Sequence, residues 1–260
     1  MRPTIACECG AYVPLRADHV GPTVFCPECH RVLLGTDRFR RRARDVLLGL
    51  KDPASMLTHA VGVLLGAAAL VLLVTFASRH ATAWHVVGFA IYGASLVLLY
   101  GASTLYHWLD LSRRGNALLQ RFDQMMIFVL IAGTYTPVCL VTLRGGWGWS
   151  ILGVVWGLTV AGWLMAHLWQ QAPDWMWAAV YLAMGWVGMV ALWPMVQAFH
   201  GTGLAWLFLG GGGYTLGALV FAMRWPNPAR WFAHHEVFHV LTLAGSVSHY
   251  FLMQNHVLWQ

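Results

Sequence analysis

Charged residues are scarce in this chain. They make up 10% of its 260 residues, while hydrophobic residues make up 58%, and soluble domains carry roughly 25% charged residues. The composition therefore excludes an ordinary soluble domain. It predicts an integral membrane protein that crosses the bilayer several times, and because a helix satisfies its own backbone polar groups in lipid, we expect an all-α fold.

Acidic side chains are rarer still. From Ala54 onward there are only four, which are Asp110, Asp123, Asp174 and Glu236. The net charge of +6 comes mostly from arginines beside hydrophobic segments, which is typical of membrane orientation signals and gives no reason to expect nucleic-acid binding. The first residues lack the pattern of a signal peptide, so we expect no cleaved leader.

Cysteine is confined almost entirely to the first 36 residues. Four of the five cysteines form two close pairs, Cys7 with Cys9 and Cys26 with Cys29. Two such pairs can direct four thiolates at one Zn²⁺ and thereby fold a segment too small for a core of its own. Residues 1–36 are therefore predicted to form a cytosolic zinc-ribbon-like domain. The alternatives are that His19 or His30 replaces one thiolate, or that the pairs are redox-active.

The remainder of the chain divides into a basic juxtamembrane linker, residues 37–53, and a transmembrane domain, residues 54–260. Seven hydrophobic segments in this domain approach the roughly 20 residues that a spanning helix needs. We predict a seven-transmembrane-helix bundle with spans at Met56–Ala77, Trp84–Tyr106, Met125–Leu143, Trp149–Leu168, Trp175–Phe199, Gly203–Met223 and Val237–Met253.

The distribution of Lys and Arg over alternate loops predicts the orientation. One side holds eleven of these residues, from Arg38 to Arg230, and the other holds only Arg79 and Arg144. Since the basic side usually stays in the cytosol, we expect a cytosolic N-terminus and an external C-terminus. The expected location is a bacterial inner (plasma) membrane.

The last segment carries a stripe of polar side chains at helical spacing. His235, His239, Thr242, Ser246 and His249 recur every three or four residues, so they share one helix face. Polar residues at such depth are expected to serve a functional site. The other membrane histidines, including His59, are expected to be hydrogen-bonded packing residues, and we expect His59 and His249 to lie away from the site.

The topology predicts which residues meet this stripe near the cytosolic side. His235 and His239, one turn apart, can hold one metal ion, and His107 at the end of the second span would complete three nitrogen ligands. Asp123 could then accept a hydrogen bond from a water in the open fourth position. Ser103, one turn from His107, could donate to an oxygen of a substrate.

These motifs resemble the haemolysin III branch of the progestin and adipoQ receptor superfamily. The resemblance rests on Ser103 with His107, the run from Arg121 through Asp123 to Pro137, and His235 and His239 followed by His249. It implies seven helices with an intracellular N-terminus, a Zn²⁺ bound by His107, His235 and His239, and Asp123 near the zinc-bound water. In adiponectin receptors and alkaline ceramidases of the wider superfamily, this site is associated with hydrolysis of lipid amides.

Four functions are compatible with the residues. The first is an intramembrane hydrolase of lipid amides or esters that uses a zinc-activated water. The second is a receptor or sensor with a structural zinc, whose ribbon contacts an unidentified cytosolic protein. The third is a pore-forming (haemolysin-like) protein, for which the sequence offers no continuous polar lining outside the stripe on the last segment. In the fourth, His235-Glu236 and His239 form a zincin protease motif with Glu236 as general base.

Overall fold

The structure is a computed structural model, and it describes residues 4–6, 12–14, 23–25, 28, 32–35, 50–169, 173–229 and 231–260. The chain divides into two compact units, Met1–Lys51 and Asp52–Gln260. The boundary falls directly before the first long hydrophobic segment. Each unit is described separately below.

The first unit contains two antiparallel hairpins. Strand β1 (Thr4–Ala6) pairs with β2 (Tyr12–Pro14), and β3 (Thr23–Phe25) pairs with β4 (Val32–Gly35). In sequence, one predicted cysteine pair falls between the strands of each hairpin. The four cysteines themselves, Cys7, Cys9, Cys26 and Cys29, lie outside the described residues, so the zinc-ribbon assignment stays a prediction.

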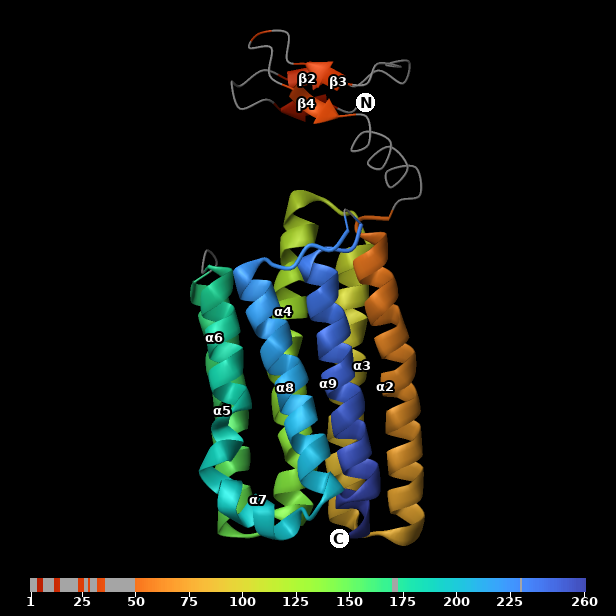
Figure 1. Cartoon of the computed structure of the whole chain (residues 1–260), viewed down its shortest axis with the longest axis vertical. Helices are drawn as coiled ribbons and strands as arrows, with labels where there is room; N and C mark the ends of the chain where they lie inside the picture. The colour runs from red at the N-terminus through yellow and green to blue at the C-terminus, as the bar shows by residue number, and fades with distance from the viewer. Residues whose placement is uncertain are drawn as a thin grey trace. The chain divides into compact units, whose positions relative to one another are not determined.

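The second unit is an all-helical bundle (Figure 1). Helices α2, α3 and α9 lie side by side in it, and α4, α5, α6 and α8 complete the bundle. Helix α4, the third span, continues past Pro137 as a π-helical turn, and the fifth span is interrupted by a 3-10 turn. The bounds are α2 Pro53–His80, α3 Ala83–Trp108, α4 Arg113–Pro137 with η1 Val138–Thr142, α5 Gly146–Leu168, α6 Asp174–Gly185 with η2 Val187–Ala191 and α7 Leu192–Ala198, α8 Thr202–Met223, α9 His234–Asn255 and η3 Val257–Trp259.

Six of these helical segments are long and apolar enough to cross a membrane. The exception among the predicted seven is α9, which has 22 residues but carries the histidines and hydroxyl residues of the polar stripe. These side chains lower its hydropathy below that of a typical span. Packing explains how such a helix is accommodated, because α9 lies against both α2 and α8 within the bundle.

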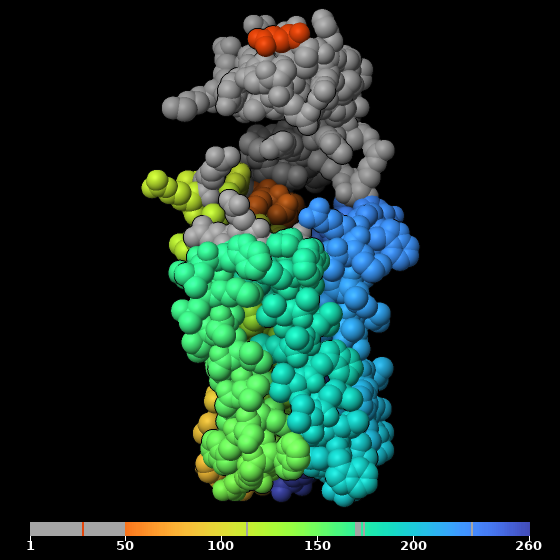
Figure 2. All heavy atoms as spheres, turned by 90° about the vertical axis from the view of Figure 1, so that its left-hand side faces the viewer, coloured from red at the N-terminus to blue at the C-terminus, as the bar shows by residue number. Residues whose placement is uncertain are grey.

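The outer surface of the bundle is apolar. Large hydrophobic side chains are exposed on every spanning segment, including Leu64 on α2, Val160 on α5, Val190 in η2 and Leu209 on α8. Figure 2 shows one such side face, over which α5, α6 and α7 extend beside α8. Soluble proteins rarely expose apolar patches on this scale. The surface is therefore that of an integral membrane protein.

The polar stripe of α9 is satisfied inside the bundle. Ser246 lies at its centre, where its Oγ is 2.6 Å from the hydroxyl of Tyr100 on α3 and 2.7 Å from that of Tyr214 on α8. The Tyr92 hydroxyl donates to the Ser246 carbonyl at 3.3 Å. Because buried hydroxyl groups need partners, this network fixes how α9 is rotated about its axis. That rotation directs His235 and His239 toward α3.

Candidate metal centre

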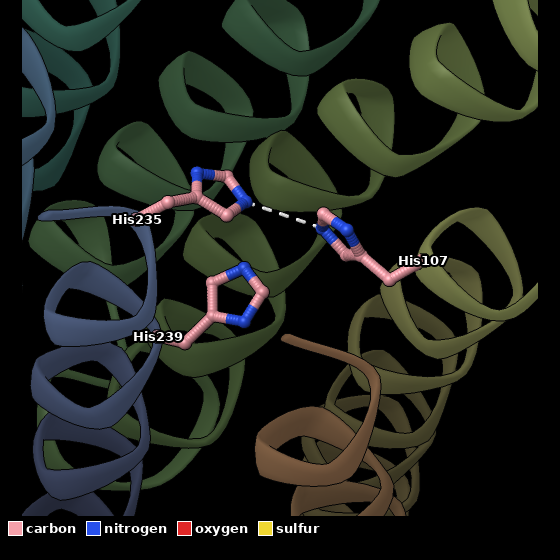
Figure 3. A group of neighbouring side chains, drawn as sticks. All are labelled: His107, His235 and His239. Atoms are coloured by element: carbon pink, nitrogen blue, oxygen red, sulfur yellow. Dashed lines mark hydrogen bonds between the residues drawn. The ribbon is translucent and has the colours of Figure 1, made fainter. Parts of the chain in front are cut away.

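Three histidines from two helices converge at one end of the bundle. His235 and His239 come from the first turns of α9, and His107 comes from the last turn of α3 (Figure 3). One nitrogen of each imidazole can be chosen so that all three lie within 4.8 Å of one another. His107 and His239 are buried. The structure thus brings the three predicted ligands together.

The geometry suits a metal ion. The Nε2 atoms of His107 and His235 are 3.2 Å apart, close to the roughly 3.3 Å expected between two nitrogens that bind Zn²⁺ tetrahedrally at about 2.0–2.1 Å. Among the residues that the structure describes, the group has three possible protein ligands, His107, His235 and His239, and no fourth His, Cys, Asp or Glu side chain belongs to it. A site with three protein ligands leaves room for a water or substrate oxygen, whereas structural zinc sites have four.

Glu236 follows the first of these histidines but has a different task. Its Oε1 accepts a hydrogen bond from Ser55 Oγ at 2.6 Å, and its Oε2 accepts one from the Ala233 backbone N–H at 2.7 Å. The carboxylate therefore caps the start of α9 and ties that helix to α2. Each of its oxygens thus accepts one structural hydrogen bond, which gives Glu236 a role in the fold that does not depend on catalysis.

Ser103 lies one turn from His107 on α3. Its side chain is 1% exposed, and its Oγ has no hydrogen-bond partner within the described residues. A buried hydroxyl without a partner is costly, so a bound group that accepts or donates a hydrogen bond would stabilise it. This is an observation in favour of a polar ligand next to the histidines.

Asp123 lies on α4, in its third turn. Its carboxylate is close enough to Tyr106 and Tyr181 to interact electrostatically with both. The Tyr106 ring in turn contacts His107, with 4.8 Å between ring centroids. Asp123 therefore lies at the same end of the bundle as the histidine group, but it is not one of the three side chains in that group.

A family model now decides the relationship. The model described as "Haemolysin-III related" matches residues 50–250, which include all three histidines, Ser103 and Asp123. The chain belongs to the haemolysin III-related family. The cysteine-containing segment lies before the matched residues.

Similarity to curated proteins supports the membership of this chain in the haemolysin III-related family. The chain is 36% identical over 201 residues to "Hemolysin-3 homolog" of Bacillus subtilis (strain 168), covering 77% of this chain and 92% of the relative. "Hemolysin-3" of Bacillus cereus is 36% identical over 208 residues, with 80% and 92% covered. "Heptahelical transmembrane protein 4" of Arabidopsis thaliana is 30% identical over 182 residues, with 62% and 46% covered. The predicted resemblance to the haemolysin III branch is confirmed.

One expectation about this haemolysin III-related bundle is wrong. His59 was expected to be hydrogen-bonded and to lie away from the site, but its ring stacks on that of His239, with 3.6 Å between centroids and 12° between planes. Both His59 nitrogens are buried and, among the described residues, have no hydrogen-bond partner. The error arose because sequence spacing gives no information on how α2 is rotated against α9.

Sequence reasoning also missed the polar residues at the start of α2. Asp52 Oδ2 is 3.1 Å from His107 Nδ1, and Thr58 Oγ1 is 3.1 Å from His239 Nδ1. Asp52 was assigned to the linker because it precedes the hydrophobic segment. The available signal was the spacing of Asp52, Ser55 and Thr58, which recur every three residues at a helix start.

Proposed function

We propose that this protein is an intramembrane hydrolase that cleaves lipid amides or esters with the help of Zn²⁺ held by His107, His235 and His239. The observation that carries the proposal is the three-histidine group, whose ligand count matches catalytic rather than structural zinc sites. When bound, Zn²⁺ would lower the pKa of a water molecule and polarise a carbonyl group. A lipid is the expected substrate class because the bundle exposes an apolar surface.

The surrounding side chains have defined roles in this proposal. Asp123 accepts a proton from the attacking water, a role that fits a carboxylate at the same end of the bundle as the histidine group. Ser103 donates its unpartnered hydroxyl hydrogen to an oxygen of the substrate. Glu236 holds α9 in place through its two hydrogen bonds and takes no part in proton transfer.

The direct test combines metal analysis of the purified protein with a screen of lipid amides and esters in detergent or bilayers. We expect zinc in the membrane unit and release of a fatty acid from at least one class of lipid. Zinc retention without turnover of any lipid would favour a receptor or sensor in which the metal is structural. Dye release from intact vesicles would instead favour a pore.

We expect the N-terminus in the cytosol and the C-terminus outside. Loops on the predicted inner side carry eleven Lys and Arg residues and those on the other side carry two, and this bias is the main sequence determinant of orientation. Reporter fusions at Gln260 and in the loop near Asp110 should give opposite signals. Equal signals at the two positions would contradict seven spans.

A second Zn²⁺ is proposed in the N-terminal unit, bound by Cys7, Cys9, Cys26 and Cys29. The pairing of β1 with β2 and of β3 with β4 supports the proposal, because each hairpin contains one cysteine pair between its strands. Deletion of residues 1–36 should remove about one zinc ion per chain and leave the membrane site filled. An unchanged zinc content after the deletion would make these cysteines candidates for a redox role.

A further inference from the structure

The first turns of α2 contribute none of the three histidines, yet they contact two of them. Asp52 meets the Nδ1 atom of His107, and Thr58 meets the Nδ1 atom of His239. We propose that Asp52 and Thr58 are positioning residues, which set the tautomer and the ring orientation of two metal-binding histidines. The proposal rests on the metal-binding part of the function proposed above.

The argument for Asp52 follows from its chemistry. A carboxylate only accepts hydrogen bonds, so the 3.1 Å contact places the proton of His107 on Nδ1 and leaves the lone pair on Nε2. Nε2 is the atom that faces His235 at 3.2 Å. The backbone N–H of Asp52 also donates to the His107 carbonyl at 2.9 Å. Asp52 therefore holds His107 at both its main chain and its ring.

The argument for Thr58 depends on the direction of a second hydrogen bond. A hydroxyl has one hydrogen, and that of Thr58 is donated to the Ser55 carbonyl at 2.8 Å. Toward His239 the hydroxyl oxygen must therefore accept, which places the proton of His239 on Nδ1. The lone pair of His239 then lies on Nε2, as it does in His107. The two contacts prepare both rings to bind a metal through the same nitrogen.

Ser55 links the same face of α2 to the third histidine indirectly. It lies midway between Asp52 and Thr58 in sequence and donates to Glu236, the neighbour of His235. Residues three apart lie on one face of a helix, so a single strip of α2 contacts the end of α3 and the start of α9. This strip holds together two helices that share a metal site but are far apart in sequence.

The size of the expected effect comes from other metal sites. Histidine ligands commonly donate their second N–H to a carboxylate or another oxygen, and loss of that partner typically costs 10–100-fold in metal affinity or activity. We expect about a 10–100-fold weaker affinity in Asp52→Ala and in Thr58→Val. Val has nearly the shape of Thr, so the second change removes the acceptor without opening a cavity.

The test is a titration of the full-length, metal-free protein with Co²⁺ alone. Both a histidine site and a thiolate site absorb in the visible when they bind Co²⁺, but only the thiolate site adds a sulfur-to-cobalt charge-transfer band in the near ultraviolet. Filling of the N-terminal cysteine site is therefore followed by that band and separated from filling of the histidine site. Asp52→Ala and Thr58→Val should weaken Co²⁺ binding and shift the absorption of the histidine site. Asp52→Glu, which restores a carboxylate, should recover most of the affinity.

Two matched controls separate positioning from a general loss of structure. Thr104→Val removes a hydroxyl that likewise donates to a carbonyl one turn earlier, that of Tyr100, at 2.7 Å. Asp110→Ala removes a carboxylate that accepts from Asn116 at 3.0 Å. Both controls should bind Co²⁺ as the wild type does. Equal weakening in the controls would overturn the positioning role.

The remaining outcomes are also decisive. Wild-type affinity in Asp52→Ala or in Thr58→Val would overturn the role of that residue. If His107→Ala loses the histidine-site absorption in the same experiment, the three histidines still bind the metal, and only the positioning role is overturned. If His107→Ala keeps that absorption, the metal binds elsewhere. In that case the proposed function is overturned together with the positioning role.

Discussion

Replacement of His107, His235 or His239 by Ala is expected to remove about one zinc ion per chain, because two remaining ligands hold the metal far more weakly than three. One nitrogen of each residue lies within 4.8 Å of one nitrogen of each of the other two, so all three can contact the same ion. The measurement is zinc content by elemental analysis of each purified variant after dialysis against a weak chelator. All three variants should lose the same ion.

His249→Ala is the matched control. His249 lies on the same helix and is also buried, but its Nε2 is 3.3 Å from the carbonyl of Leu207 on α8, outside the three-histidine group. This variant should keep its zinc. His59→Ala is not suitable as a control, since the His59 ring stacks on His239. Loss of zinc in His249→Ala with full zinc in His107→Ala would contradict the site.

Replacement of Asp123 by Asn is expected to lower the turnover of the lipid substrate by about 100-fold to 10,000-fold, the usual contribution of a general base. The variant should retain its zinc, since Asp123 is not one of the three grouped side chains. The measurement is the turnover rate of the substrate found in the lipid screen, with zinc content determined on the same sample.

Glu236→Gln provides the comparison for Asp123→Asn. Both changes neutralise a carboxylate at the histidine end of the bundle, but Glu236 is bonded to Ser55 and to the backbone of Ala233. We expect Glu236→Gln to retain turnover and to lose about 1 kcal/mol of stability, because Gln keeps one acceptor oxygen but loses one of the two hydrogen bonds. Abolished turnover in Glu236→Gln with normal turnover in Asp123→Asn would identify Glu236 as the base.

The sequence predicts the helices well because their hydrophobic runs are long. Each of the seven predicted segments corresponds to a helical segment. The largest difference is at the start of α4, which begins at Arg113 rather than at the predicted Met125, while α2 and α3 extend only slightly further, to His80 and Trp108. The interruption of the fifth span between Gly185 and Leu192 was not predicted. The marker was present in Pro194, which has no backbone N–H and whose ring crowds the carbonyl of Val190, four residues earlier and inside the interruption.

The three histidines of the site could be predicted because topology and helical spacing place them at one depth. Their neighbours could not. The stacking of His59 on His239 and the contacts of Asp52 and Thr58 depend on the rotation of α2 about its axis. That rotation is set by packing, for example at Gly62, where an added Cβ would lie 2.5 Å from an atom of the Tyr100 ring. Spacing within one segment carries no information about such a contact.

The most direct test of the metal centre is an anomalous diffraction map of the full-length protein, recorded at the zinc absorption edge. We predict a peak about 2.0–2.1 Å from one nitrogen of each of His107, His235 and His239, with a non-protein oxygen in the fourth position. A map without a peak between these three residues, or a fourth side chain that closes the coordination shell, would contradict a zinc site open to substrate.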